Sequence, residues 1–127
     1  MQIIFGTENA QNMAEKHIVL ELDTMRFDPT QVVTTAYCVL QNLPMADLHL
    51  VVDNSELHHD MMEMYRDRRW SEAVEIISQI RDYWGDEMHS FYDAMTERMQ
   101  GLIEHDPGAD WDHVVTRAVT IAEAEPA

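Results

Sequence analysis

The sequence predicts an α+β fold, in which an N-terminal antiparallel β-hairpin or small sheet precedes about four amphipathic helices packed as a helical layer. Residues 17–41 are rich in β-branched and aromatic side chains and partly alternate with a period of two, which is typical of strands. From residue 53 onward, apolar residues recur every three or four positions, which is typical of helices. The 127 residues, 46% of them hydrophobic, predict a single domain, 1–127, mainly β over 1–44 and helical over 53–125.

The charge of the chain excludes some classes of partner. It carries 24 acidic residues against 8 lysines and arginines, a net charge of −16, and residues 52–127 alone carry −12. Binding to nucleic-acid phosphates or to anionic lipid through a basic surface is therefore not expected, because both need clustered cations. The sequence has no apolar run of membrane-spanning length and no signal pattern at its N-terminus, so a cytoplasmic protein without membrane association is expected.

The strand signals lie in the first 41 residues. Gln2–Phe5 is a short apolar run ended by Gly6, which is typical of an edge strand, and residues 7–16 form either a loop or a short helix. The hairpin is predicted to pair residues 17–27 with residues 32–41.

Two ambiguities remain in this part of the chain. Asp28 followed by Pro29 suits the start of a type I turn between the two strands. Apolar residues within 32–41 also fit a four-residue step, so a helix there stays an alternative to a strand. Residues 45–52 either alternate as a strand or extend the next helix backwards.

Four helices are predicted beyond the hairpin. Asp53 can cap the first, Ser71 the second, Asp86 the third and Asp110 the fourth, while Gly85 ends the second. The segment from Tyr65 to Ala73 resembles the helix–turn–helix junction of a tetratricopeptide unit, which implies a helical hairpin between the first two helices. The apolar stripes of the four helices are expected to face the core: Leu57, Met61, Met64 and Tyr65; Ala73, Val74, Ile77, Ile80 and Trp84; Met88, Phe91, Tyr92, Met95, Met99, Leu102 and Ile103; Trp111, Val114, Val115, Ala118, Ile121 and Ala122.

One position is set apart from these stripes. Met62 lies off the stripe of the first helix and is the best candidate for contact with a partner.

Trp84, Phe91 and Met95 are expected to be buried together at the junction of the second and third helices. Replacing Phe91 by alanine is therefore expected to cost about 3–5 kcal/mol.

Two carboxylate–histidine pairs suggest a metal site. Glu56-x-x-His59 and Asp110-x-x-His113 have the spacing used in di-iron helical bundles, and such ligands suit iron or manganese. At 100° per residue, however, both pairs point away from the apolar stripes, whereas bundle metal sites point inward. We therefore interpret them as solvated acidic faces and predict no metal ligand, with an iron- or manganese-dependent enzyme as the alternative function.

Other candidate catalytic groups are also isolated. His89 and Asp93 are one helical turn apart, but Ser90 points about 100° away from that pair, so a surface pair without a nucleophile is predicted. Cys38 lies in an apolar strand and is expected to be a small core residue. No glycine-rich phosphate loop or nucleophile elbow occurs, so we predict no catalytic residue and no cofactor-binding residue.

Four phrases carry a resemblance to a known group of proteins: Leu22–Thr24, Thr35–Val39, Tyr65–Trp70 and Trp84–Asp93. Over residues 17–100 the chain resembles small proteins of tailed marine phages and ocean metagenomes that have no assigned function. The resemblance implies a phage source, the host cytoplasm as location and an accessory role on a host component, and it implies no site residue.

These observations favour a small acidic, non-enzymatic interaction protein that binds a protein partner, with a basic protein as one candidate. A homodimer is also expected, with its interface concentrated in the least acidic region, residues 17–45, through an exposed hairpin edge or an apolar helix face.

Overall fold

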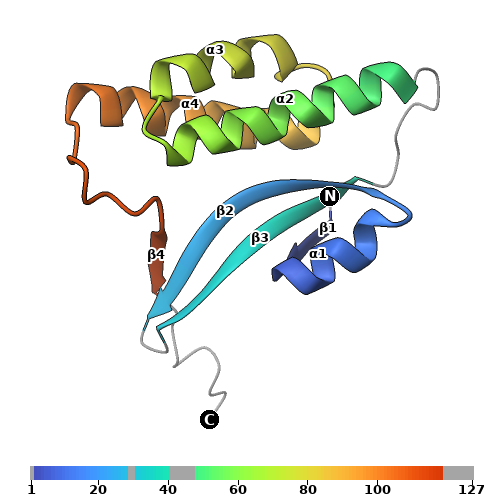
Figure 1. The fold of residues 1–127 in the computed structure, drawn as a ribbon, viewed down its shortest axis with the longest axis horizontal. Helices are drawn as coiled ribbons and strands as arrows, with labels where there is room; N and C mark the ends of the chain where they lie inside the picture. Colours follow the sequence, from blue (N-terminus) through green and yellow to red (C-terminus); the bar gives the residue numbers. More distant parts are fainter. Residues whose placement is uncertain (1, 29–30, 41–47, 119–127) are drawn as a thin grey trace.

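The computed structural model describes residues 2–28, 31–40 and 48–118. Its elements follow one another as β1 (Gln2–Phe5), α1 (Thr7–Ala14), β2 (Ile18–Asp28), β3 (Val32–Leu40), α2 (Leu48–Arg66), α3 (Trp70–Ile80), α4 (Asp86–Glu104) and β4 (Val115–Ala118). Figure 1 shows a curved sheet beneath a layer formed by α2, α3 and α4. The predicted α+β class, a small sheet with a helical layer, is confirmed.

The sheet has the strand order β1-β3-β2-β4. The hairpin of β2 and β3 is antiparallel, from Ile18 opposite Leu40 to Phe27 opposite Val32, which confirms the predicted pairing and excludes a helix over residues 32–40. A bulge between Glu21 and Thr24 interrupts its register. Since β1 pairs with β3, and β4 pairs with part of β2, both sides of the hairpin carry a further strand.

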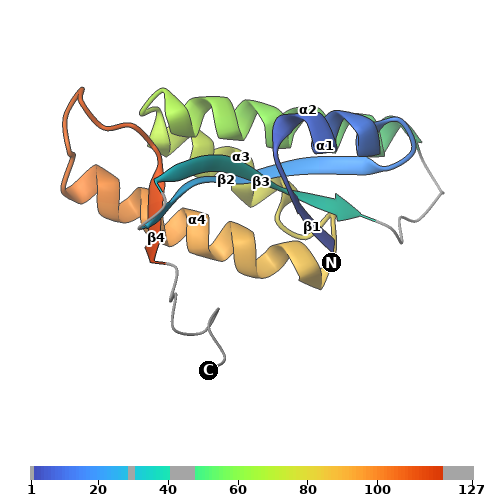
Figure 2. The same ribbon diagram turned by 90° about the horizontal axis from the view of Figure 1, so that it is seen from below.

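The sheet has helices on both faces. Helices α2, α3 and α4 cover the convex face, and α1 lies against the opposite face, near β1, as the two views in Figures 1 and 2 show. Helix α1 connects β1 to β2 across β3, because β3 lies between those two strands in the sheet. Of the two alternatives for residues 7–16, the short helix is therefore the one that forms.

The core lies mainly between the helical layer and the sheet. Helices α2 and α3 pack as the predicted helical hairpin. Trp84 and Met95 are buried as expected, but Phe91 is only half-buried, so a cost of about 3–5 kcal/mol for Phe91→Ala, which assumes a fully buried ring, is too large. The buried side chains of the helical layer include Met61, Met62, Tyr65, Trp70, Ala73, Ile76, Ile77, Ile80, Met88, Tyr92, Met95 and Met99.

Several predicted helix ends are wrong by a few residues. Helix α2 begins at Leu48, not at Asp53, so residues 48–52 belong to the helix, while residues 45–47 lie outside the described part of the chain. Helix α3 begins at Trp70 without a side-chain cap from Ser71 and ends at Ile80. Gly85, predicted to end that helix, instead directly precedes α4, where it adopts a positive φ of 87°.

The predicted fourth helix, starting at Asp110, is wrong. Helical structure ends at Glu104, and β4 (Val115–Ala118) pairs in parallel with Met25–Asp28 of β2, while residues 119–125 lie outside the described residues. The apolar spacing in this segment serves another purpose: the ring of Trp111 packs edge-on against Tyr65 and Trp70 at 5.2 and 5.3 Å. An available strand edge and an aromatic anchor thus override the helical pattern.

No helix in the described part of the chain is both long and apolar enough to span a membrane.

Candidate functional site

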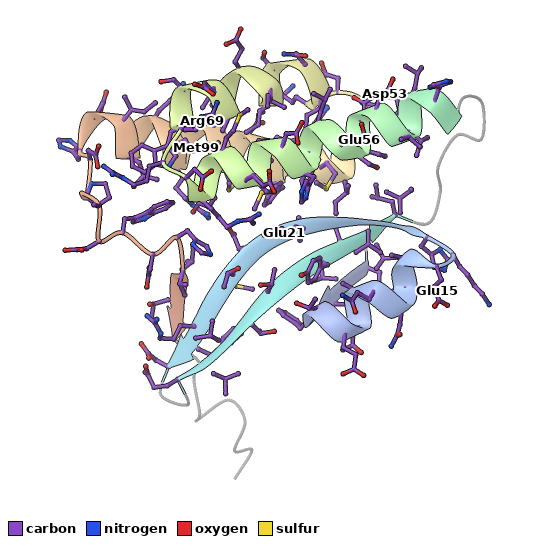
Figure 3. The ribbon with its side chains drawn as sticks, in the orientation of Figure 1. Glu15, Glu21, Asp53, Glu56, Arg69 and Met99 are labelled. Carbon is purple, nitrogen blue, oxygen red and sulfur yellow. The ribbon has the colours of Figure 1, made fainter. Side chains whose placement is uncertain are left out.

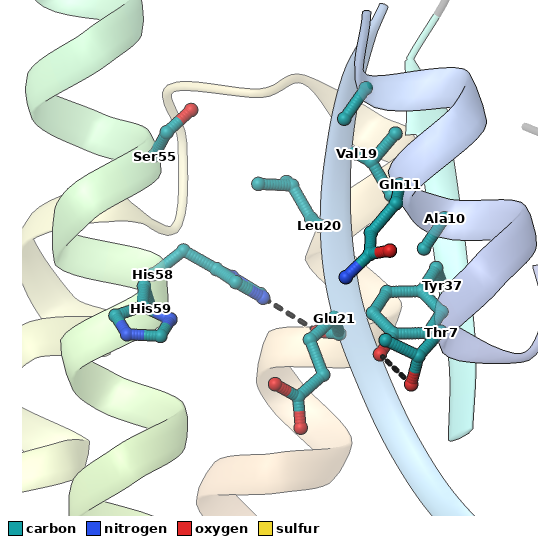
Figure 4. Close-up of a pocket in the computed structure, with 11 residues that line it drawn as sticks. Thr7, Ala10, Gln11, Val19, Leu20, Glu21, Tyr37, Ser55, His58 and His59 are labelled. Carbon is teal, nitrogen blue, oxygen red and sulfur yellow. Dashed lines mark hydrogen bonds between the residues drawn. The ribbon is translucent and has the colours of Figure 1, made fainter. Parts of the chain in front are cut away.

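A groove lies beside β2, between α1 and α2. Figure 4 views it with α2 on one side of the strand and α1 on the other. Its cavity volume is about 240 Å³. The lining residues come from three places: Thr7, Ala10, Gln11 and Ala14 of α1; Val19, Leu20, Glu21 and Tyr37 of the sheet; and Ser55, His58 and His59 of α2.

The strand pairing explains why a groove forms here. Strand β2 is paired with β3 over most of its length, whereas β4 pairs with Met25–Asp28. Among the described residues, the preceding part of β2 therefore has helices rather than a second strand beside it. Two small residues, Ala10 and Ala14, face this part of the strand from α1, and their short side chains leave the space open.

The walls of the groove carry several oxygen atoms. The hydroxyls of Thr7 and Tyr37 lie 3.4 Å apart, as Figure 4 marks. The Oγ atom of Ser55 is buried and has no hydrogen-bond partner. An unpartnered buried hydroxyl costs free energy unless a water or a ligand bonds to it, so Ser55 offers an unused polar contact.

His58 closes the inner end of the groove and is only 1% exposed. Its Nε2 donates a hydrogen bond of 2.6 Å to the carbonyl oxygen of Glu21, because a carbonyl can only accept. The other ring nitrogen, Nδ1, therefore accepts from the hydroxyl of Tyr92 at 2.8 Å. Burial lowers the pKa of His58 from 6.5 to about 4 and raises the pKa of Tyr92, so the imidazole is neutral at pH 7.

Two ion pairs join β2 to the helical layer next to His58. Oε2 of Glu21 binds Arg66 of α2, and Asp23 binds Arg98 of α4 at 2.7 Å. Arg98 also donates to the hydroxyl of Tyr65 at 3.2 Å. The bulge between Glu21 and Thr24 breaks the alternation of β2 where both carboxylates reach the helices.

The proposed metal ligands do not come together. Glu56 and His59 are exposed on α2, as the helical geometry predicts, and His59 pairs with Glu63 at 3.2 Å. Asp110 is exposed, and His113 is half-buried at a positive φ of 53° in a segment that is not helical. Within residues 2–28, 31–40 and 48–118, no group of three or more histidines, cysteines and acids could hold a metal ion.

The predicted pair of His89 and Asp93 is also replaced by other contacts. His89 lies 2.9 Å from Asp82, whereas Asp93 accepts two hydrogen bonds from Arg81, at 2.6 and 3.0 Å. The hydrogen bond from Arg81 lowers the pKa of Asp93. Cys38 is fully buried in β3, which confirms its predicted place in the core.

The helical pattern of the sequence misplaces two residues of α2. Met62, predicted to face a partner, is instead 2% exposed. His58, which the pattern does not place in the core, is buried there. With Leu57 at zero, the predicted stripe ends near +80°, whereas His58 lies at about 100° and Met62 at about 140°. The wider buried face arises because α2 contacts β2 as well as α3.

The groove holds few groups that could activate a nucleophile. A nucleophile needs a base within hydrogen-bond reach, and among the described residues that line the groove no serine or threonine hydroxyl is hydrogen-bonded to a histidine. What the groove offers is an apolar floor with acceptor atoms around it.

Comparisons with protein-family models, with curated proteins and with solved structures find no match to this chain.

Proposed function

We propose that this chain is a small, acidic, non-enzymatic interaction protein that binds a basic segment of a partner protein in the groove between α1 and α2. The observation that carries the proposal is the groove itself, which joins an apolar floor to acceptor oxygens and an unpartnered buried hydroxyl at Ser55. Binding sites commonly combine an apolar lining with a few such polar groups.

The charge of the protein supports a basic partner. Glu21 of β2 is the acidic residue among those that line the groove, and Figure 3 labels it together with Glu15, just after α1, and Glu56 on α2. With a net charge of −16, the field of the whole chain attracts cations and speeds their encounter with the groove. A phage accessory protein that acts on a host component in the host cytoplasm would use a surface of this kind.

A peptide array tests this function with the full-length chain. The array holds nine-residue peptides of constant apolar content whose charge varies from acidic to basic. Because Glu21 lines the groove and the chain carries a net charge of −16, binding should increase with the positive charge of the peptide and weaken at high salt. Binding that is equal across the array, or that favours acidic peptides, would contradict the proposal.

A matched pair of variants locates the binding. Ala14 lines the groove and is exposed, so Ala14→Trp should fill the groove without disturbing the core. Ala94 is exposed on α4 and is not among the lining residues, so Ala94→Trp is the control. We expect Ala14→Trp to abolish peptide binding and Ala94→Trp to leave it unchanged. Equal binding by the two variants would place the interaction elsewhere on the surface.

We also propose a homodimer. Its contact lies at β1 and not at the edge of the hairpin, where the sequence pattern predicts it. Strands β1 and β4 flank the hairpin, so β1 is the end strand on one side of the sheet. Three apolar residues are exposed there: Ile3 at 49% and Phe5 at 44% on β1, and Val33 at 50% on β3. An end strand with exposed apolar side chains is a ready surface for a second copy.

Light scattering at micromolar concentration checks the dimer. The expected mass is twice 14.8 kDa, and Ile3→Lys should give a monomer. Ile103→Lys, at a similarly exposed position on α4, should leave the dimer intact. A monomer mass for the unmodified chain rules the dimer out.

A further inference from the structure

The residues around the groove divide into an apolar floor and a carboxylate at one end. Ala10, Val19 and Leu20 supply apolar surface from α1 and β2. Glu21 follows directly on β2, and in Figure 4 its carboxylate extends from the strand into the space beside α2. A ligand that lies along the floor therefore reaches a negative charge at its end.

We propose that the groove recognises one lysine or arginine side chain of the partner. Its aliphatic stem lies on Ala10, Val19 and Leu20, and its cationic head binds the carboxylate of Glu21. This inference rests on the binding function proposed above and adds the chemical group that is recognised. A basic side chain matches both parts of the site, since its stem is apolar and its head is charged.

Glu21 has capacity for a second cation. Arg66 contacts Oε2, and among the described residues Oε1 carries no hydrogen bond. An ionised carboxylate has about four acceptor positions, so the pair with Arg66 does not exhaust it. The side chain of Glu21 is 21% exposed, and a partly buried charge is screened less by water and salt than a surface charge.

The lining of the groove holds further acceptors besides Glu21. Ser55 offers its unpartnered hydroxyl oxygen, and Gln11 and Tyr37 line the same space. A lysine ammonium carries three donors and an arginine guanidinium five, so either needs several acceptors when it leaves water. The groove supplies them within one lining.

The size of the groove fits a side chain better than a cofactor. Its volume of about 240 Å³ lies below the roughly 300–1,000 Å³ of pockets that hold drug-sized ligands. A nucleotide would also bring negative charge to the carboxylate of Glu21, in a chain of net charge −16. One extended basic side chain, anchored by the backbone that carries it, is small enough for this volume and brings no negative charge.

Three small probes test the recognised group directly. The amides of the full-length chain are followed by NMR while Nα-acetyl-lysine methylamide, the norleucine analogue and the Nε-acetyl-lysine analogue are added in turn. The lysine probe should shift the amides of Ala10, Val19 and Glu21 with saturation in the millimolar range. The other two probes match its stem but lack the charge, so they should bind at least about tenfold more weakly.

Two variants control for the site. Glu21→Gln keeps the shape of the side chain and should weaken lysine binding about tenfold or more. Because Glu21→Gln also loses the ion pair with Arg66, Ala14→Trp is tested beside it, since that change leaves both residues in place. Ala14→Trp should abolish the shifts, and Ala94→Trp should not.

The outcomes separate this inference from the binding function. Norleucine binding as strong as lysine binding, or no shift at the groove with any probe, overturns the recognition of a basic side chain. Array peptides that need an open groove but no lysine or arginine would overturn it too, and they would contradict the basic partner while still supporting the groove as a binding site. Lysine-dependent shifts that vanish in Ala14→Trp support it, even if every array peptide fails and the partner role is lost.

Discussion

The interior of the helical layer is packed with apolar side chains, whereas the seam between that layer and β2 is held by hydrogen bonds and ion pairs. In the interior, Met88, Met95 and Met99 of α4 are fully buried, with Ile77 and Ile80 of α3. In the seam, two ion pairs join β2 to the helices, Glu21 with Arg66 and Asp23 with Arg98. Beside them, a hydrogen bond joins His58 of α2 to Tyr92 of α4.

The interior and the seam differ in how strictly their contacts depend on geometry. Apolar burial is roughly proportional to area and has no direction, so methionines fill the interior without demanding one geometry. Buried polar groups cost free energy unless they are paired, so the seam tolerates only one register of β2 against the helices. The interior therefore supplies most of the stability, and the seam fixes where the sheet docks.

The largest loss is expected in the interior. Met95→Ala removes a fully buried side chain and should lower the free energy of unfolding by about 2–5 kcal/mol. Met95→Leu nearly conserves volume and should cost less than about 1.5 kcal/mol. Urea unfolding measures both. Similar losses for leucine and alanine would mean that the interior requires a defined shape, which would remove its contrast with the seam.

In the seam, removing one charge should be nearly as costly. Arg98→Met leaves the carboxylate of Asp23 without its partner, and breaking a buried pair costs about 3–5 kcal/mol. Because the pair keeps some exposure, we expect about 3 kcal/mol in urea unfolding. Adding Asp23→Leu should recover most of the loss by removing the unpaired charge. A double variant that is less stable than Arg98→Met alone would show that the Asp23 side chain stabilises the fold even without Arg98, and that an unpaired charge does not explain the loss.

A third effect depends on pH. Folding lowers the pKa of His58 from 6.5 to about 4, so between these values the unfolded chain binds more protons than the folded chain. Stability should therefore fall as the pH decreases through this window, with His58 contributing a loss of about 2 kcal/mol by pH 5. Urea unfolding at pH 7 and pH 5 measures the loss, which should shrink in His58→Gln but not in His105→Gln, whose histidine is exposed. The same loss in both variants would assign the pH dependence to the carboxylates.

The smallest effect is expected at the surface. With 24 acidic residues against 8 basic ones, exposed carboxylates repel one another at pH 7, and salt screens that repulsion. Raising the salt from low to moderate concentration should increase stability by less than about 1 kcal/mol. Thermal unfolding at several salt concentrations measures it. A melting temperature that falls with salt would show that the seam's ion pairs outweigh the surface repulsion.

Much of the fold follows from local pattern. The period-two alternation of residues 17–27 and the β-branched run that follows predict the hairpin because side chains of a strand alternate between two faces. The recurring apolar positions of α4 predict its buried face because one helical turn takes 3.6 residues. The buried position of Cys38 follows from the apolar strand around it.

The candidate site could not be assembled from local pattern. Thr7, Glu21 and Ser55 lie far apart in the sequence, and each is an ordinary polar residue of its own element. His58 gave one available signal, since it borders the apolar stripe of α2 at about 100° and could have been placed on its edge. Its partners, the Glu21 carbonyl and the Tyr92 hydroxyl, come from elements 37 and 34 residues away.

Local signals in the chain specify the hairpin, the three helices that follow it and the acidic surface. The neighbours of these elements depend on how the chain folds. Folding turned the segment after Asp110 into a strap that ends in β4, because β2 offered an unpaired edge at Met25–Asp28 and Tyr65 and Trp70 accepted the ring of Trp111. It also buried His58 and Met62, because α2 packs against two neighbours and not one. Periodicity states which face of a helix is apolar, but burial depends on how many surfaces surround it, and that number is set only when the chain has folded.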